Sequence, residues 1–259
     1  MRSAGADLRL AMQNRPREPF IEYIDILRNY FPLESAYAGE IPAVKATQRL
    51  KFHAKATFFI GENGSGKSTL LEAIAVADGF NAEGGTRNFN FATRASHSDL
   101  YKWIRLGRSM RGKRRKDGFF MRAESFYNVA TEIEKLGVRG YADYHAQSHG
   151  EAFLHLITDR LRGDGLYLFD EPEAALSPQR QLVFLAAMHS LIERESQFVI
   201  ATHSPIIMAY PEATIYEFSA GGIREVAYRD TEHFRVTHAF LSRTDQMLQE
   251  LFKEDEESP

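Results

Sequence analysis

The chain has 259 residues, of which 44% are hydrophobic and 26% are charged, and this composition is typical of a soluble globular protein with a sizeable core. It contains no cysteine, which excludes disulfides, thiolate metal ligands and thiol catalysis and favours a reducing, cytoplasmic setting. The formal net charge of −3 gives no overall attraction to nucleic acid, and no apolar run reaches the roughly 18 residues that a membrane span needs, so we expect no membrane insertion.

The first part of the chain is expected to supply a small antiparallel sheet. Residues 1–19 lack the apolar core of a secretion signal and are predicted to be flexible. Phe20–Asn29 fits strand and helix spacing alike, but its isoleucines and tyrosine favour a strand. Gln48–His53 alternates as a second strand would. An aromatic side chain from this region could stack on an adenine, although core packing is the commoner use of such residues. The candidates are Tyr30, Phe31 and Tyr37.

Residues 61–69, with the sequence GENGSGKST, fit the phosphate-binding pattern G-x-x-x-x-G-K-[ST]. The apolar run before them suits a buried strand, and the run after them consists mostly of helix formers. Strand, loop and helix together aim backbone N–H groups and a helix N-terminus at one point, where polyphosphate charge is stabilised. Lys67 would reach the β- and γ-phosphates, and Ser68 would ligate Mg²⁺. The predicted nucleotide-binding residues are Gly61, Glu62, Asn63, Gly64, Ser65, Gly66, Lys67, Ser68 and Thr69.

A break at Asp78–Thr86 ends this helix, and His97–Leu106 again has helix spacing. Seven Lys and Arg side chains then crowd Arg105–Lys116. They could bind nucleic acid phosphates or an acidic partner, but no base-reading motif accompanies them, so a solvated loop is the stronger expectation. Gly118–Arg122 is predicted to be a further core strand, and Glu124 lies just beyond it.

Ser148 and Glu151 form a capping box, S-x-x-E, at the start of the helical run Glu151–Leu161. The same helix N-terminus has small residues and could hold an anion. The residues alone leave both interpretations open.

The apolar run Leu166–Phe169 ends in two carboxylates, Asp170 and Glu171. An acidic residue at the end of such a strand supplies the Mg²⁺ partner of a phosphate loop, which here is Asp170. Because the chain turns at Pro172, Glu171 can face the nucleotide too and can polarise the attacking water. Ser177 then caps the next predicted helix.

The strand Gln197–Ala201 is followed by His203. A histidine at the carboxyl end of a core strand in an open α/β sheet lies where ligands bind, so we assign His203 to the site. Beyond it the sequence predicts a hairpin, a terminal helix over Thr231–Phe252 and an acidic tail at residues 253–259.

In combination, these motifs resemble those of the ABC-type ATPases, above all a bacterial group of small stand-alone ATPases, with distant similarity to RecF and chromosome-maintenance ATPase heads. The resemblance rests on GENGSGKST, SHGEAF, YLFDEPEAALSP and ATHSP in that order. It implies a P-loop NTPase α/β fold of ABC-ATPase type: a mainly parallel core sheet, an N-terminal antiparallel β part and a small helical subdomain. One ATPase domain would span residues 20–252, with a helical insert at about 85–164.

The resemblance also implies residue roles. Lys67 matches the phosphate-loop lysine, Asp170 the metal carboxylate, Glu171 the catalytic carboxylate and His203 the switch histidine that contacts the γ-phosphate. Ser148 and Gly150 match the signature that completes the nucleotide site of the opposite subunit, although His149 stands where that signature has its first glycine. Glu124 lies about where a glutamine normally touches Mg²⁺.

The expected activity is Mg²⁺-dependent ATP hydrolysis at the interface of an ATP-gated head-to-tail homodimer. Hydrolysis would drive a conformational switch, with nucleic acid as one partner class through Arg105–Lys116. Two alternatives stay open: the ATP-binding subunit of a transporter, which the altered signature disfavours, and an ATP-sensing regulatory or defence module with low turnover, which Glu171 disfavours.

Overall fold

The computed structural model describes residues 17–27, 41–82, 84–85, 98–109, 115–122 and 153–253. The fold is α/β, with a mainly parallel six-stranded sheet and a separate antiparallel three-stranded sheet, as the sequence predicted. The strand order of the larger sheet is β5-β6-β7-β3-β8-β9, in which only β9 runs antiparallel to its neighbour. Its strands are β5 (Asp117–Arg122), β6 (Gly165–Asp170), β7 (Gln197–Ala201), β3 (Ala56–Gly61), β8 (Ala213–Ser219) and β9 (Gly222–Glu225).

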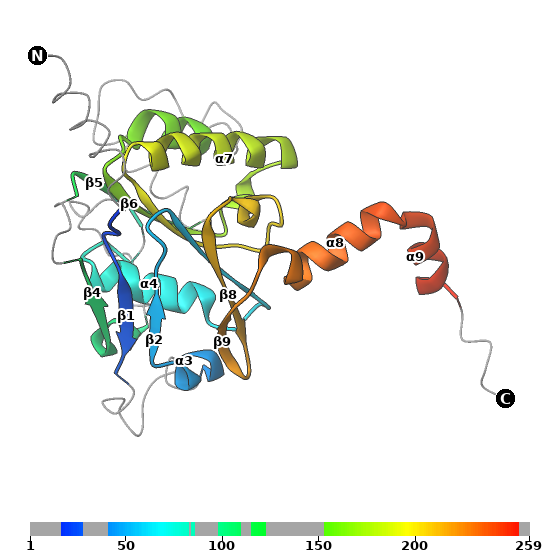
Figure 1. Cartoon of the computed structure of the whole chain (residues 1–259), viewed down its shortest axis with the longest axis horizontal. Coiled ribbons are helices and arrows are strands. Elements are labelled where there is room, and N and C mark those ends of the chain that lie inside the picture. The colour runs from blue at the N-terminus through cyan, green and yellow to red at the C-terminus, as the bar shows by residue number, and fades with distance from the viewer. Residues whose placement is uncertain are drawn as a thin grey trace, which may run out of the picture.

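The three central strands of this sheet are buried along their whole length. Their apolar runs require a helix on each face, because both faces of a parallel sheet are covered. Helix α4 (Lys67–Ala77) covers one face and α7 (Pro178–Glu193) the other (Figure 1). The Ser177 side chain caps α7 by accepting a hydrogen bond from the backbone N–H of Arg180, as predicted.

The smaller sheet has the order β2-β1-β4, with β1 (Tyr23–Ile26), β2 (Arg49–Lys51) and β4 (Ile104–Gly107). The helix predicted over residues 97–106 is wrong, because strand β4 forms at Ile104–Gly107. Only a 3₁₀ helix, η2 (Asp99–Trp103), forms there, and the chain then pairs with β1. Gly107 lies against the Tyr23 ring, so closely that a Cβ would be 2.3 Å from it. Pairing with a distant strand thus overrides the local helix spacing.

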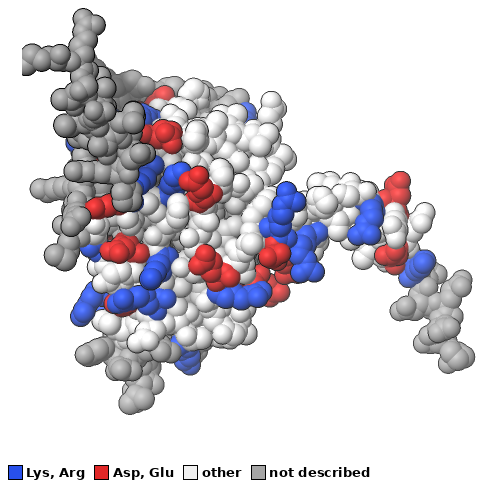
Figure 2. Space-filling view, in the orientation of Figure 1, with Lys and Arg blue, Asp and Glu red and all other residues white. Residues whose placement is uncertain are grey.

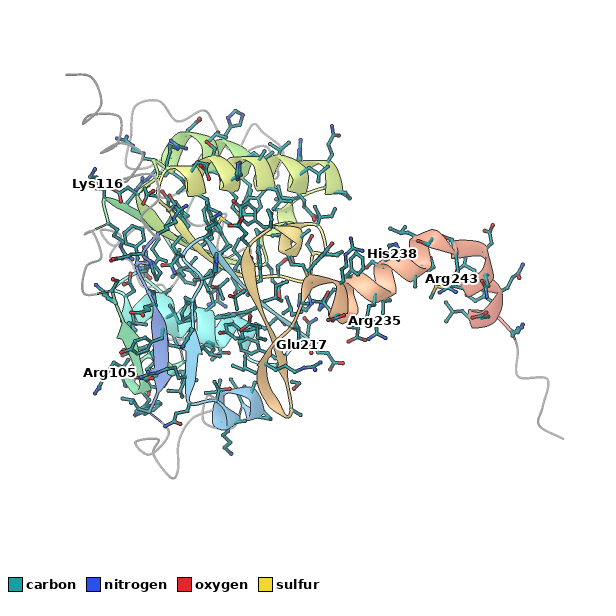
Figure 3. The ribbon with its side chains drawn as sticks, in the orientation of Figure 1. Arg105, Lys116, Glu217, Arg235, His238 and Arg243 are labelled. Carbon is teal, nitrogen blue, oxygen red and sulfur yellow. The ribbon has the colours of Figure 1, made fainter. Side chains whose placement is uncertain are left out.

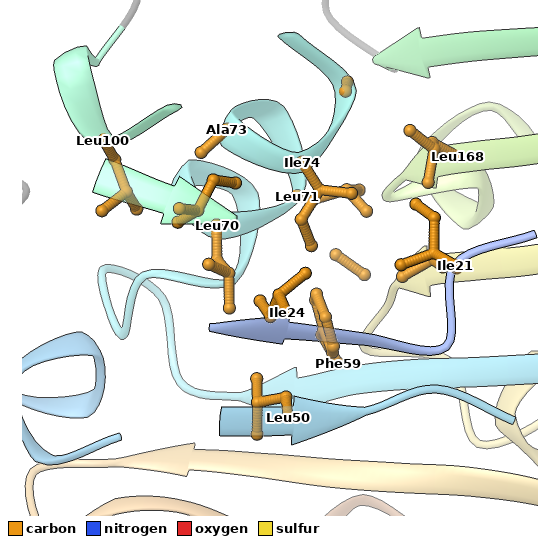
Figure 4. Close-up of a cluster of buried hydrophobic side chains, with 14 of the residues drawn as sticks. Ile21, Ile24, Leu50, Phe59, Leu70, Leu71, Ala73, Ile74, Leu100 and Leu168 are labelled. Atoms are coloured by element: carbon orange, nitrogen blue, oxygen red, sulfur yellow. The ribbon is translucent and has the colours of Figure 1, made fainter. Parts of the chain in front are cut away.

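Helix α4 lies between the two sheets, and its apolar side chains join them into one core (Figure 4). Ile24 and Leu50 come from the smaller sheet, while Phe59 and Leu168 come from the larger one. This packing fixes the start of α4, and therefore the glycine-rich loop before it, against the carboxyl ends of the core strands.

The terminal helix predicted over Thr231–Phe252 is two helices, α8 (Glu232–Ser242) and α9 (Thr244–Leu251), which project from the body (Figure 1). Arg243 between them departs from helical angles, with φ −142° and ψ 44°, and the Thr244 hydroxyl donates to the carbonyl of Phe240. The remaining short elements are α3 (Pro42–Ala46), η5 (Leu156–Arg160), η6 (Pro172–Ala175), η7 (Ile207–Ala209) and η8 (Tyr228–Asp230).

The described part of residues 85–164 includes β4 and β5 as well as η2 and η5. Within the described residues, no helix combines the length and the apolar character that a bilayer crossing requires.

Candidate nucleotide site

The loop between β3 and α4 has a backbone that only glycine adopts readily. Gly61, Gly64 and Gly66 have φ values of 133°, 77° and 100°. A Cβ on Gly61 would lie 2.4 Å from the carbonyl oxygen of Phe218 on β8, and one on Gly66 would lie 2.5 Å from the Ile41 side chain. The spacing of the motif therefore matches both the angles and the packing of the loop.

Lys67 is the first residue of α4 and is only 3% exposed. Its ammonium group donates hydrogen bonds of 2.8 Å to the carbonyl oxygens of Gly61 and Glu62. Burial lowers the pKa of Lys67, and the carboxylates of Glu171 and Asp170 act in the opposite direction. A side chain with three donors has thus used two of them on its own loop.

Ser68 and Asp170 are in direct contact: the serine hydroxyl donates to Asp170 Oδ1 at 2.9 Å. Asp170 is the last residue of β6 and is 7% exposed. On its other side, Arg122 Nε lies 3.8 Å from Asp170 Oδ2, while Arg122 Nη1 contacts Glu72 of α4 at 2.5 Å. Among the described residues no group of three His, Asp or Glu side chains could hold a metal ion by itself.

Glu171 follows β6 in a left-handed conformation, with φ 50° and ψ 52°. Its backbone N–H donates to the carbonyl of Ala201 at 2.9 Å, and Pro172 begins η6. The chain therefore turns immediately after Asp170, as the sequence predicted. Glu171 Oε1 lies 3.7 Å from His203 Nε2.

Glu173 is a residue of this site to which the sequence analysis gave no role. Its carboxylate accepts hydrogen bonds from the Thr202 hydroxyl at 2.7 Å and from the backbone N–H of His203 at 2.5 Å. Burial raises the pKa of Glu173, while these two donors lower it. Glu173 stands inside the motif YLFDEPEAALSP, so its sequence signal was present, but the motif alone did not say what it contacts.

His233 is a second residue without an earlier role. Its Nε2 lies 3.1 Å from Nδ1 of His203. Burial lowers the pKa of both histidines, and the positive charge of Lys67 lowers it further. His233 belongs to the terminal helix, and no local sequence pattern connects it with the site.

The sheet register explains why these groups meet. Ala201 at the end of β7 pairs with Asp170 of β6 and with Phe59 of β3. The carboxyl ends of the three strands therefore lie side by side, which is the edge where open α/β sheets bind ligands. Glu62, Asn63 and Gly64 are exposed at this edge.

The Ser65 hydroxyl at the same edge is buried and has no hydrogen-bond partner among the described residues. A cleft of about 550 Å³ adjoins the outer side of the loop. Its lining includes residues 61–65 together with Glu217, Phe218 and Glu232.

Several predicted residues lie outside the described part of the chain. These are Glu124, Ser148, Gly150 and the three aromatic candidates for adenine stacking, Tyr30, Phe31 and Tyr37.

The basic stretch Arg105–Lys116 is described in part, and three of its cations have acidic partners. Arg108 and Arg115 both contact the buried carboxylate of Asp78, and Lys116 lies 3.3 Å from Asp164. Arg105 and Lys116 lie well apart on the molecule (Figure 3). On the face shown in Figure 2, the basic and acidic side chains of the described residues are interspersed and form no single-sign patch.

Two family models match the chain. One, described as an AAA domain, matches residues 43–128 and includes the glycine-rich loop. The other, described as an AAA ATPase domain, matches residues 153–208 and includes Asp170, Glu171 and His203. Each match covers less than half of the chain, and the two together support an ATPase of the AAA type. No curated protein shows a significant match to the sequence.

Solved structures that match include a putative metal-chelate-type ABC transporter in an inward-facing conformation, at 16% identity over 84% of this chain and 88% of that chain, with a TM-score of 0.45. CbiO1 from Clostridium perfringens, part of the ABC transporter complex cbiONQ, matches at 15% identity over 90% and 100% of the two chains, with a TM-score of 0.49. The SMC head domain from Thermotoga maritima matches at 16% identity over 69% and 92%, with a TM-score of 0.38. Similarity at this level assigns neither substrate nor partner.

Proposed function

We propose that this chain, which resembles P-loop ATPases of the AAA/ABC type, hydrolyses ATP with Mg²⁺ at the carboxyl edge of its core sheet. One observation carries the proposal. The glycine-rich loop, the Ser68–Asp170 contact and the Glu171–His203 pair converge on the same edge from three separate strands.

The loop would bind the triphosphate. Its backbone N–H groups and the N-terminus of α4 offer fixed positive dipoles to the phosphates. Lys67 would exchange the carbonyls of Gly61 and Glu62 for phosphate oxygens, and the unpartnered Ser65 hydroxyl would gain an acceptor.

Ser68 and Asp170 are the residues that would hold Mg²⁺. When bound, the ion supplies positive charge that neutralises charge on the transferred phosphoryl group. A hydroxyl and a carboxylate oxygen are the kind of ligands that Mg²⁺ prefers, and Ser68 Oγ and Asp170 Oδ1 lie together at 2.9 Å, so the chemistry of this pair fits the ion.

Glu171 and His203 would act on the terminal phosphate. The Glu171 carboxylate would accept a hydrogen bond from the attacking water and orient it in line. His203 would donate from its Nε2 to the γ-phosphate. This nitrogen lies 3.7 Å from Glu171 Oε1 and is buried without a hydrogen-bond partner among the described residues.

The proposed active form is an ATP-gated head-to-tail homodimer, in which Ser148 and Gly150 of one subunit complete the nucleotide site of the other. Hydrolysis then opens the dimer. The site supports this by its openness, because the side chains of Glu171 and His203 are 41% and 31% exposed. A second subunit could therefore reach the phosphates.

A further question is which partner the conformational change would act on. A nucleic acid contact through Arg105–Lys116 loses weight, because three of its described cations already contact the carboxylates of Asp78 and Asp164. A transporter subunit or an ATP-sensing module would use the same site.

The test is to replace Glu171 by Gln and to measure phosphate release and size-exclusion elution with Mg·ATP. We expect turnover to fall by about 10²–10⁴-fold, because the group that orients water is lost, while ATP binding persists and the variant accumulates as a dimer. Glu193→Gln, at the far end of α7, is the matched control and should retain turnover. Unchanged turnover in the Glu171 variant would refute the catalytic assignment. A monomer with bound ATP would refute the dimer alone.

A further inference from the structure

Two histidines from distant elements form a directly hydrogen-bonded pair in the site. His203 follows β7, and His233 is the second residue of α8. Nδ1 of His203 and Nε2 of His233 are 3.1 Å apart, and the ring centroids are separated by 5.3 Å. The two outer nitrogens, His203 Nε2 and His233 Nδ1, are buried and have no hydrogen-bond partner among the described residues.

The fold fixes the position of His233. Thr231 is fully buried, and its hydroxyl caps α8 by accepting a hydrogen bond from the backbone N–H of Phe234 at 3.2 Å. The Tyr228 ring packs on Phe234, and the Tyr228 hydroxyl donates to the carbonyl of Pro205 at 2.9 Å. The first turn of α8 is thereby tied to the segment that carries His203.

The surroundings favour the neutral form of both imidazoles. Burial and the positive charge of Lys67 lower the pKa of each ring, and these effects outweigh the acidic groups that face them, Glu171 for His203 and Glu232 and Glu217 for His233. A neutral imidazole carries one N–H and one bare nitrogen. The hydrogen bond between the rings therefore needs one donor and one acceptor.

Only one of the two arrangements suits the surroundings. If His203 donated from Nδ1, its bare Nε2 would face the Glu171 carboxylate at 3.7 Å, and two acceptors would oppose each other. If His233 donates from Nε2, His203 carries its proton on Nε2, directed toward Glu171.

We propose that His233 is a positioning residue that holds His203 in the tautomer with its proton on Nε2, so that His203 presents a donor to the terminal phosphate. The inference rests on the proposed ATPase function and assigns a positioning residue to that same site. It also makes the base of α8 part of the nucleotide site, because the pair exists only while α8 is docked through Tyr228 and Thr231.

The test uses the full-length chain with ¹⁵N-labelled histidine, in which long-range ¹H–¹⁵N spectra distinguish the two tautomers of His203. Three variants are compared with the parent chain. His233→Phe keeps a ring and removes the donor, while His233→Gln retains an N–H donor at the end of the side chain. His238→Phe is the control, because His238 lies farther along α8 (Figure 3). Its ring stacks on Phe234.

In the parent chain and in His238→Phe, we expect the Nε2–H tautomer of His203. His233→Phe should give a mixture of tautomers and a loss of about 10–100-fold in kcat with a smaller change in KM. His233→Gln should restore most of the Nε2–H tautomer and most of the kcat. An Nδ1–H tautomer in the parent chain, or an unchanged tautomer in His233→Phe, would overturn the inference whatever the turnover. A tautomer that follows His233 in a chain that does not hydrolyse ATP would refute the proposed function and leave the control of the tautomer standing.

Discussion

The hydroxyl of Ser68 donates a 2.9 Å hydrogen bond to the carboxylate of Asp170, 102 positions farther along the chain. The contact joins the first turn of α4 to the end of β6 and exists because Leu70 and Leu71 bury α4 against the sheet that contains β6. A helix start and a strand end are thus brought together by core packing, and the same packing places a hydroxyl and a carboxylate oxygen side by side, which are the kind of ligands that Mg²⁺ prefers.

The first prediction concerns this pair. Ser68→Ala should raise the Mg²⁺ concentration needed for half-maximal ATP hydrolysis by about tenfold or more, because one of two protein oxygens is lost. Ser68→Thr keeps the hydroxyl and is the matched control. The measurement is the rate of phosphate release as a function of Mg²⁺ concentration, and identical curves for the two variants would exclude Ser68 as a ligand.

The second prediction compares two glycines of the loop. Gly61 and Gly64 have φ values of 133° and 77°, so alanine is strained at both positions and more strained at Gly61, whose angle lies outside the left-handed region. Only at Gly61 would the new Cβ collide with the backbone of Phe218; at Gly64 no atom lies within 4 Å. Gly61→Ala should therefore be less stable than Gly64→Ala by about 1–3 kcal/mol in urea unfolding. Equal stabilities would show that β8 can move away without cost.

The phosphate loop, β3, β6 and β7 were predictable because a continuous stretch of sequence determines each of them. Apolar runs define the strands, glycines define the loop, and polar residues follow at the strand ends. Asp170 was assigned as the Mg²⁺ partner of the phosphate loop because it ends an apolar strand, and His203 was assigned to the site because ligands bind at the carboxyl ends of the strands in an open α/β sheet.

What the sequence did not reveal lies in contacts between distant segments. His203 receives its backbone partner Glu173 from 30 positions earlier and its ring partner His233 from 30 positions later. Neither spacing corresponds to a helix or strand period. Strand β4 was missed for the same reason, because its residues have helix spacing and become a strand only by pairing with β1.

The third prediction follows from Glu173. Glu173→Gln should destabilise the fold by about 1–3 kcal/mol, because the Thr202 hydroxyl and the His203 backbone N–H donate to different oxygens of the carboxylate, and an amide has only one accepting oxygen. Turnover should fall as well, since His203 loses its anchor. The exposed Glu225→Gln is the control and should lie within about 0.5 kcal/mol of the parent chain. An unaffected unfolding midpoint for Glu173→Gln would mean that Thr202 and His203 find other acceptors.

The fourth prediction concerns the projecting helices. No residue of α9 is buried, and Leu251 and Phe252 are 67% and 74% exposed. Ending the chain after Ser242 should therefore change the free energy of unfolding by less than about 0.5 kcal/mol. Thermal unfolding of the shortened and full-length chains measures this. A clear loss of stability would show that α9 is covered in solution, and a dependence of that loss on protein concentration would identify a second copy as the cover.

The last prediction is a pH dependence of stability that originates in the histidine pair. Both folded-state pKa values are lowered from the ordinary value of 6.5, mainly by burial. Between the folded and unfolded pKa values the unfolded chain binds more protons, so the contribution of the pair is fully present above pH 6.5 and is lost as the pH falls through the folded values. In His233→Phe, unfolding should take up about one proton fewer in this window, which gives a shallower loss of stability. Urea midpoints between about pH 7.5 and pH 5.5 measure the slope, with His238→Phe as the control. If the slope in His233→Phe is as steep as in the parent chain, His233 binds protons equally well in the folded and unfolded chains, and this prediction is wrong.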